Sequence, residues 1–168
     1  MQVERQEGAS VNDHWCIRYQ IIMPMEDILV EEEKRGDSNW SYTYRYPAKS
    51  EENKYINLIK KEIPEDETIL EDFGGAYING LKHAVFTVYT KKTNILKREN
   101  EIKKILRDNT YSISYSDEIQ LNEKGYVKIN IPMEFDKETI EEIYNLIGAT
   151  DYYIDFTDTC GMYMVYKI

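Results

Sequence analysis

The sequence has little of the side-chain chemistry on which most enzymes depend. It contains two histidines, His14 and His83, and neither stands in a recognised catalytic spacing. His14 and Cys16 share one face of an expected strand, but no further ligands follow at the spacing of a four-ligand zinc site. A cysteine beside a turn, such as Cys160 near Asp158, more often packs than acts as a nucleophile. We therefore expect a protein that is not an enzyme and that holds no metal and no cofactor.

Several other signals are missing as well. Gly74-Gly75 lacks the context of a phosphate-binding loop and precedes a strand instead of a helix. No apolar run approaches the roughly 18 residues of a membrane span, and the polar residues 1–12 lack the apolar segment of a signal peptide. Two cysteines in a chain of 168 residues are typical of a reducing compartment. We expect a cytoplasmic protein with no membrane partner.

Acidic side chains, in contrast, are abundant. The net charge is -10, although residues 91–107 carry seven basic side chains against two acidic ones. The rest of the chain is therefore more acidic than the total suggests. Such a surface repels the phosphates of nucleic acids and attracts basic partners. We expect no direct binding to nucleic acid, and we expect the basic segment to pair with the acidic halves that it connects.

Three acidic clusters are candidate surfaces for a partner: Glu31–Glu33, the segment 62–72, and the group formed by Asp151, Asp155 and Asp158. A run of charges is most often a solvated face, but carboxylates beside aromatic residues can also imitate nucleic acid phosphates or dock on a basic groove. Because loop charges contribute little to folding, replacement of residues 65–67 is expected to leave the fold intact. The predicted partner-binding residues are Glu31, Glu32, Glu33, Glu65, Asp66, Glu67, Glu71, Asp72, Tyr153, Asp155, Asp158 and Tyr163.

Aromatic residues gather on one predicted strand. Trp40, Tyr42, Tyr44 and Tyr46 alternate with smaller or charged residues and so share one face. Tyrosine and tryptophan give large rigid contact area with a polar tip, as a docking surface or an aromatic pocket requires. The alternative is that these tyrosines fill a partly hydrated interface between a sheet and a helix. The sequence leaves both interpretations open.

The order of elements in the first half of the chain recurs in the second. Residues 40–46 lead through Pro47 into a helix, and residues 126–131 lead through Pro132 into another. Each helix is followed by an acid-aromatic strand and then by an apolar strand. Because internal repetition governs the architecture, we predict an α+β fold with a mostly antiparallel sheet and helices on one side. Its internally duplicated ββαββ halves are joined by a helix.

The expected organisation is a flexible N-terminal arm over 1–12, a first half over 13–90, a linking basic helix over 91–109 and a second half over 110–168, in one compact body. Residues 14–23 alternate as a strand, and residues 24–38 form a charged excursion. Ser50 is expected to cap the first helix. Asp136 and Gly148 are expected to begin and end the third helix.

This plan resembles, in topology alone, that of gyrase-inhibitor-like effector-binding domains. The resemblance implies a small-molecule effector-binding module with an aromatic pocket between the two repeats, which an acid such as Glu71 would make selective for cations. We favour a different interpretation, a non-enzymatic acidic binding protein that inhibits or neutralises a basic protein partner of the nuclease or toxin class. Immunity proteins and phage-type inhibitors of nucleases or defence systems act in this way. A small-molecule ligand remains the alternative.

Overall fold

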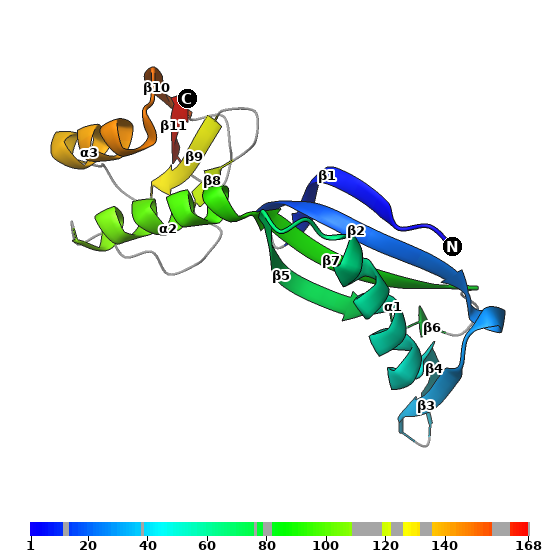
Figure 1. Ribbon diagram of the computed structural model, residues 1–168. Helices are drawn as coiled ribbons and strands as arrows, with labels where there is room; N and C mark the ends of the chain where they lie inside the picture. Colours follow the sequence, from blue (N-terminus) through cyan, green and yellow to red (C-terminus); the bar gives the residue numbers. More distant parts are fainter. Residues whose placement is uncertain are drawn as a thin grey trace. The chain divides into compact units, whose positions relative to one another are not determined.

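The computed structural model describes residues 1–11, 14–37, 39–75, 77–78, 82–108, 119–121, 126–131, 136–155 and 162–167, and it is α+β (Figure 1). Every strand pair whose register is described is antiparallel. The chain forms two units, each with its own apolar core. Unit 1 comprises Met1–Ala9 and Cys16–Lys91, and unit 2 comprises Ser10–Trp15 and Lys92–Ile168.

Unit 1 is built on a four-stranded sheet with the order β1-β2-β7-β5. Its strands are β1 (Glu4–Val11), β2 (His14–Pro24), β7 (His83–Lys92) and β5 (Glu67–Gly74). The alternating apolar residues of β2 and β7, such as Tyr19 opposite Val88 and Ile21 opposite Phe86, face helix α1 (Lys49–Glu62). Tyr55, Ile56 and Ile59 of α1 cover this face, and Ile59 is fully buried. The strand predicted at 14–23 and the helix that packs on it are thus confirmed.

The start of α1 differs from its prediction. Its N-cap is Ala48, and no side chain caps the helix, so Ser50 does not have the expected role. The backbone of Ala48 is held instead, because its N–H donates to the carbonyl of Leu29 at 2.8 Å. The incoming chain is therefore positioned by a backbone contact to the segment before β3 (Val30–Gly36), which compensates for the missing side-chain cap.

Residues 4–11, expected within a flexible arm, form strand β1 beside β2. Side chains attach this strand to the sheet. Arg5 donates from Nε to the hydroxyl of Tyr19 at 3.0 Å, and the buried thiol of Cys16 lies 3.3 Å from the carbonyl of Ala9. A polar N-terminal segment can be ordered in this way, since its charged side chains point to partners on the neighbouring strands.

The charged excursion predicted over 24–38 contains a strand. After the short 3-10 helix η1 (Met25–Asp27), β3 pairs along its whole length with β4 (Ser41–Pro47), from Val30 opposite Pro47 to Gly36 opposite Ser41. The two residues of β6 (Tyr77–Ile78) complete this second sheet, whose order is β3-β4-β6. We call the β3–β4 pair the ribbon. Figure 1 shows it extending away from the four-stranded sheet.

Unit 2 has a four-stranded sheet with the order β10-β11-β9-β8. Two helices, α2 (Thr93–Asp108) and α3 (Lys137–Ile147), pack on the same face of it. This follows because Ile102 of α2 and Ile143 of α3 share one buried cluster with Val127 and Tyr166, which lie opposite each other in the sheet. The strands are β8 (Ile119–Leu121), β9 (Tyr126–Ile131), β10 (Asp151–Asp155) and β11 (Met162–Lys167).

Helix α2, predicted as a basic linker, is a core element of unit 2. Ile102 and Leu106 are buried in its apolar cluster, and Arg98 donates to the carbonyl of Leu146 in α3 at 2.5 Å. The basic residues occupy the remaining faces, as an amphipathic helix requires. Helix α3 confirms its predicted ends. Asp136 accepts from the N–H of Thr139 at 2.8 Å, and Gly148 follows in a left-handed conformation with φ 63°.

The predicted correspondence between 40–46 and 126–131 does not extend to the sheets. Strand β4 lies in the three-stranded sheet with β3 and β6, whereas β9 lies between β11 and β8 in the four-stranded sheet of unit 2. The shared strand-proline-helix order is therefore a local similarity. Residues 109–118, at the start of the expected second half, lie outside the described residues.

Candidate functional site

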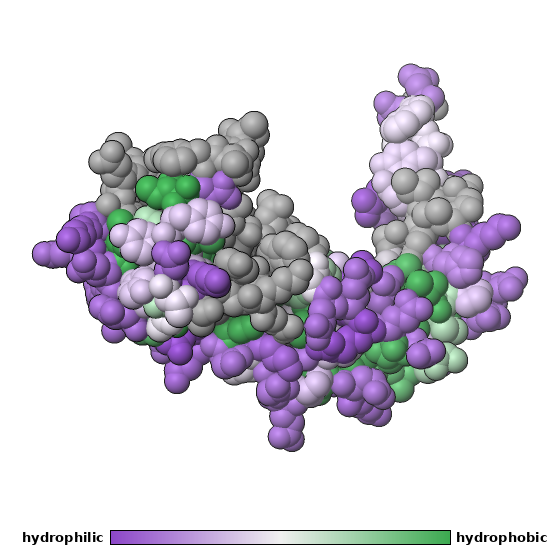
Figure 2. All heavy atoms as spheres, turned by 90° about the horizontal axis from the view of Figure 1, so that it is seen from above, coloured by the Kyte–Doolittle hydropathy of each residue, from purple (hydrophilic) through white to green (hydrophobic). Residues whose placement is uncertain are grey.

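The ribbon brings the first acidic cluster and the aromatic strand together. Its register places Glu31 opposite Tyr46, Glu33 opposite Tyr44 and Arg35 opposite Tyr42. Neighbouring residues on a strand alternate between its faces, so all six side chains lie on one face. Glu31–Glu33 are all exposed. Figure 2 shows a projecting column where the ribbon lies. Its residues are coloured from pale to purple, so they range from weakly to strongly hydrophilic.

Trp40, directly before β4, and the tyrosines Tyr42 and Tyr44 of β4 stack edge to face. The ring centroids are 5.2 Å apart between Trp40 and Tyr42, and 4.7 Å apart between Tyr42 and Tyr44. Trp40 is 70% exposed, which leaves most of its indole available for contact. Hydrogen bonding to the neighbouring Tyr42 hydroxyl raises the pKa of Tyr44, so the Tyr44 phenol stays neutral at physiological pH. The result is a rigid, amphipathic row of rings.

Ion pairs organise the acids of the ribbon. Arg35 donates to Glu33 at 3.1 Å, and its guanidinium lies 5.0 Å from the centroid of the Tyr44 ring. On the opposite face, Nε of Arg45 is 3.4 Å from a carboxylate oxygen of Glu32, as an ion pair without a well-formed hydrogen bond. Hydrogen bonding to Glu33 raises the pKa of Arg35. Exposed pairs of this kind contribute little stability, so the carboxylates remain available to a partner.

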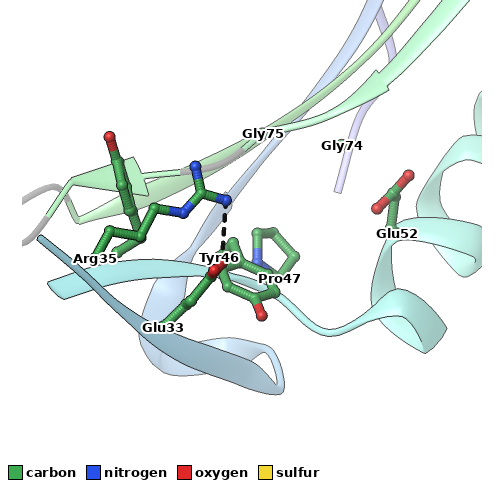
Figure 3. Close-up of a pocket in the computed structure, with 8 residues that line it drawn as sticks. Glu33, Arg35, Tyr46, Pro47, Glu52, Gly74 and Gly75 are labelled. Carbon is green, nitrogen blue, oxygen red and sulfur yellow. Dashed lines mark hydrogen bonds and ion pairs between the residues drawn. The ribbon is translucent and has the colours of Figure 1, made fainter.

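A hollow with a volume of about 430 Å³ adjoins the ribbon. Figure 3 shows that its walls come from three parts of unit 1, with the ribbon on one side, the first turn of α1 on another and the end of β5 behind. Its lining consists of charged, aromatic and backbone groups, which come from Glu33, Arg35, Tyr44, Tyr46, Pro47, Glu52, Gly74 and Gly75.

A glycine at the end of β5 permits the approach of α1. A Cβ built on Gly74 would lie 2.3 Å from Cγ and 2.9 Å from Oε2 of Glu52, far inside normal contact. Glu52 also forms an ion pair of 3.0 Å with Lys49, which lies one turn earlier on the helix. The missing side chain at Gly74 therefore lets the Glu52 carboxylate lie across the strand end and face the hollow (Figure 3).

The second acidic cluster is divided between surface and interior. Glu65 and Asp66 are exposed, Glu71 is half-buried, and Asp72 forms an ion pair of 2.8 Å with Lys60 of α1. Glu67 differs from all of them, because its side chain is fully inaccessible. The predictions that Glu67 contacts a partner and that its replacement leaves the fold intact both require an exposed side chain. The structure places this residue in the interior instead.

Glu67 is the centre of a buried polar network. Its carboxylate accepts hydrogen bonds from Thr90 at 2.6 Å and Tyr19 at 2.8 Å, and Arg5 lies at 3.4 Å. Burial by itself raises the pKa of Glu67, but the hydrogen bonds from Thr90, Tyr19 and Arg5 outweigh it and leave the pKa lowered. These residues come from β1, β2, β5 and β7, so Glu67 links all four strands of the sheet.

The third group belongs to unit 2. Tyr153 lies on β10 and is 53% exposed, and Asp155 ends that strand. Tyr163 lies on β11, where only its backbone is described, and Asp158 is outside the described residues. The structure thus joins Glu31–Glu33 to the aromatic row, whereas the predicted residues of unit 2 form a separate set.

Five residues of the hollow were not predicted as site residues: Arg35, Pro47, Glu52, Gly74 and Gly75. The tyrosines of β4 already shared a face, and a hairpin turn at Gly36 would have placed Arg35 opposite them. Gly74-Gly75 lacks the context of a phosphate-binding loop, and its local sequence does not indicate that a helix approaches it closely. The contact between Glu52 and Gly74 joins residues far apart in the sequence, so no local sequence pattern indicates it.

Within the described ranges, no three His, Cys, Asp or Glu side chains are arranged to hold a metal ion. Among the helices that the structure describes, none has the length and apolar character needed to cross a membrane. Comparisons with protein families, curated proteins and solved structures gave no match to this chain. Any function must therefore be argued from the site itself.

Proposed function

We propose that the chain is a non-enzymatic acidic binding protein that docks on a basic protein partner and blocks it. One observation carries this proposal. Three consecutive exposed carboxylates, Glu31–Glu33, share a projecting ribbon with an exposed tryptophan and a row of stacked tyrosines. Aromatic side chains supply most of the energy at protein interfaces, and surrounding charges steer the encounter and fix its orientation.

The proposed partner is a cationic protein of the nuclease or toxin class. A protein that acts on nucleic acid has a basic groove, and the exposed carboxylates of the ribbon would occupy it in place of phosphates. The net charge of -10 supports attraction to such a groove and opposes direct binding to nucleic acid. An immunity protein or a phage-type inhibitor must bind such a groove without binding nucleic acid, and both act in the cytoplasm.

We also propose that the two units are duplicated ββαββ halves, but with a different correspondence from that expected. The sheet orders are β1-β2-β7-β5 and β8-β9-β11-β10, and in each a helix follows the second strand. This shared order supports β2 as the counterpart of β9. The ribbon and β6 are then additions to the first half, which is consistent with a specialised role for the ribbon.

A small-molecule effector module is the second candidate. The hollow favours it, since tyrosines and carboxylates together suit a small cation. This hollow lies within unit 1 and is bounded by the ribbon, α1 and β5. It is not the expected pocket between two repeats.

A charge-reversal experiment tests the proposal. The partner is first captured from the native host with the wild-type chain and then purified. Its affinity is compared for wild type, for a variant with Glu31, Glu32 and Glu33 changed to Lys, and for a control with the exposed residues Asp108, Glu138 and Glu141 changed to Lys. Both variants change the net charge equally. We expect at least about a tenfold loss, or about 1.4 kcal/mol, for the ribbon variant only. Equal losses in both variants would overturn the proposal.

A further inference from the structure

We propose that the hollow beside the ribbon receives one arginine side chain of the partner. This inference rests on the proposed function and specifies how the ribbon recognises a basic surface. The volume of about 430 Å³ lies within the roughly 300–1,000 Å³ usual for ligand sites, so a guanidinium group and its stem fit inside it.

The charges of the lining favour a cation. Glu33 and Glu52 contribute carboxylates, and Arg35 is the one basic residue among the described residues of the lining. Arg35 is already bound to Glu33 at 3.1 Å, so its charge is compensated inside the site. The carboxylate of Glu52 faces the hollow from the other side (Figure 3). The charges of the lining residues therefore sum to -1, and the only described ion pair of Glu52 is with Lys49, which lies outside the lining.

The aromatic wall favours a guanidinium over an ammonium group. Arg35 lies 5.0 Å from the Tyr44 centroid, which shows that a ring of this wall accepts a stacked guanidinium. Tyr46 is two residues further along the same face of β4 and also lines the hollow. Arginine can stack on a ring and bind a carboxylate with two parallel hydrogen bonds at the same time, whereas lysine cannot.

Glu52 can exchange its present ion pair for one with an incoming arginine. Its present ion pair is with Lys49, whose side chain is 74% exposed, and such pairs are weak. Gly74 keeps the carboxylate of Glu52 close to the strand end, where a side chain would displace it. The structure therefore holds an oriented acid that a stronger, bidentate partner can capture.

The test needs no partner and uses the whole chain. Amide NMR spectra are recorded during titration with N-acetyl-arginine amide, with N-acetyl-citrulline amide as a neutral control of nearly the same shape. We expect saturable shifts at the amides of Tyr46, Gly74 and Gly75 with the arginine compound and none with citrulline. Glu52→Gln should weaken arginine binding at least about threefold, because one charge-assisted contact is lost. Glu62→Gln, at the exposed far end of α1, should leave it unchanged.

Equal shifts with citrulline, shifts only elsewhere, or no saturable shift with the arginine compound would each overturn the inference. An unchanged affinity in Glu52→Gln would overturn it as well. The charge-reversal experiment on Glu31–Glu33 is independent of these results. If arginine fails to bind but charge reversal still weakens the partner complex, the proposed function stands and only the occupant of the hollow is wrong.

Discussion

Glu67 shows how a residue that looks like a surface acid can stabilise an interior. Its carboxylate is inaccessible and receives hydrogen bonds from Thr90 and Tyr19, with Arg5 close by. The sequence offered no sign of this, because the donors lie 23, 48 and 62 residues away. Its acidic neighbours Glu65 and Asp66 are exposed as predicted. Position along the chain could not separate the two roles.

Replacement of Glu67 should change how stability depends on pH. Its pKa is lowered in the folded protein, so its stabilising effect is present above the unfolded pKa of about 4.5 and is lost as the pH falls below it. Glu67→Gln should lower the free energy of unfolding at pH 7 by roughly 1–3 kcal/mol, since buried donors lose a charged acceptor. Urea unfolding should show that the difference from wild type shrinks towards pH 3. A constant difference at all pH values would contradict this role.

The contact between Gly74 and Glu52 predicts a non-additive pair of substitutions. Gly74→Ala places a Cβ against the Glu52 side chain and should cost about 1–3 kcal/mol of unfolding free energy, as overpacking does. In a Glu52→Ala background the same change should cost almost nothing, because the obstructing atoms are gone. Thermal or urea unfolding of the four proteins measures this cycle. An equal loss of unfolding free energy on Gly74→Ala in both backgrounds would show that the two side chains are not in steric conflict.

At the scale of elements, helices with local signals were predictable and the ribbon was not. Asp136, Gly148 and the apolar stripe of α3 lie within one short segment, so its boundaries and buried face followed from sequence alone. Strand β3 carries mostly charged residues and lacks apolar alternation. It is a strand because it pairs with β4, which is a non-local cause. The basic residues of α2 predicted a linking helix, whereas Ile102 and Leu106 place it in the core of unit 2.

Helix α3 provides a test of the unit 2 core. Ile143 is completely buried, and Ile143→Ala should lower the free energy of unfolding by about 2–5 kcal/mol through lost contacts and a residual cavity. Lys137→Ala, on the exposed side of the same helix, is the matched control and should have little effect. Denaturant unfolding with an unchanged midpoint for Ile143→Ala would remove α3 from the core.

The ribbon should be removable without unfolding unit 1. Val30 and Pro47 pair at its base, so residues 31–46 can be replaced by the two-residue turn Asn-Gly, which suits an antiparallel connection. We expect circular dichroism and cooperative unfolding to remain close to those of wild type, while partner binding is lost. Retained binding by the folded, shortened chain would exclude the ribbon as the docking element.

At the scale of the whole molecule, the sequence predicts the net charge directly, and the fold determines which charged side chains are exposed. The net charge of -10 is independent of structure. The fold buries Glu67, holds Asp72 against Lys60 and leaves Glu31–Glu33 exposed beside aromatic rings. Of these three arrangements, the last combines accessible acids with exposed aromatic contact area. A surface composed in this way steers a basic partner before it makes short-range contacts.

The most direct test of the account is the dependence of the association rate on ionic strength. For wild type and the purified partner, the association rate constant should fall steeply between about 50 and 500 mM salt, because screening shortens the reach of the acidic ribbon. The variant with Glu31, Glu32 and Glu33 changed to Lys should associate more slowly at low salt and show a much weaker dependence. The control with Asp108, Glu138 and Glu141 changed to Lys should keep most of the wild-type slope. Identical slopes for wild type and the ribbon variant would contradict the account.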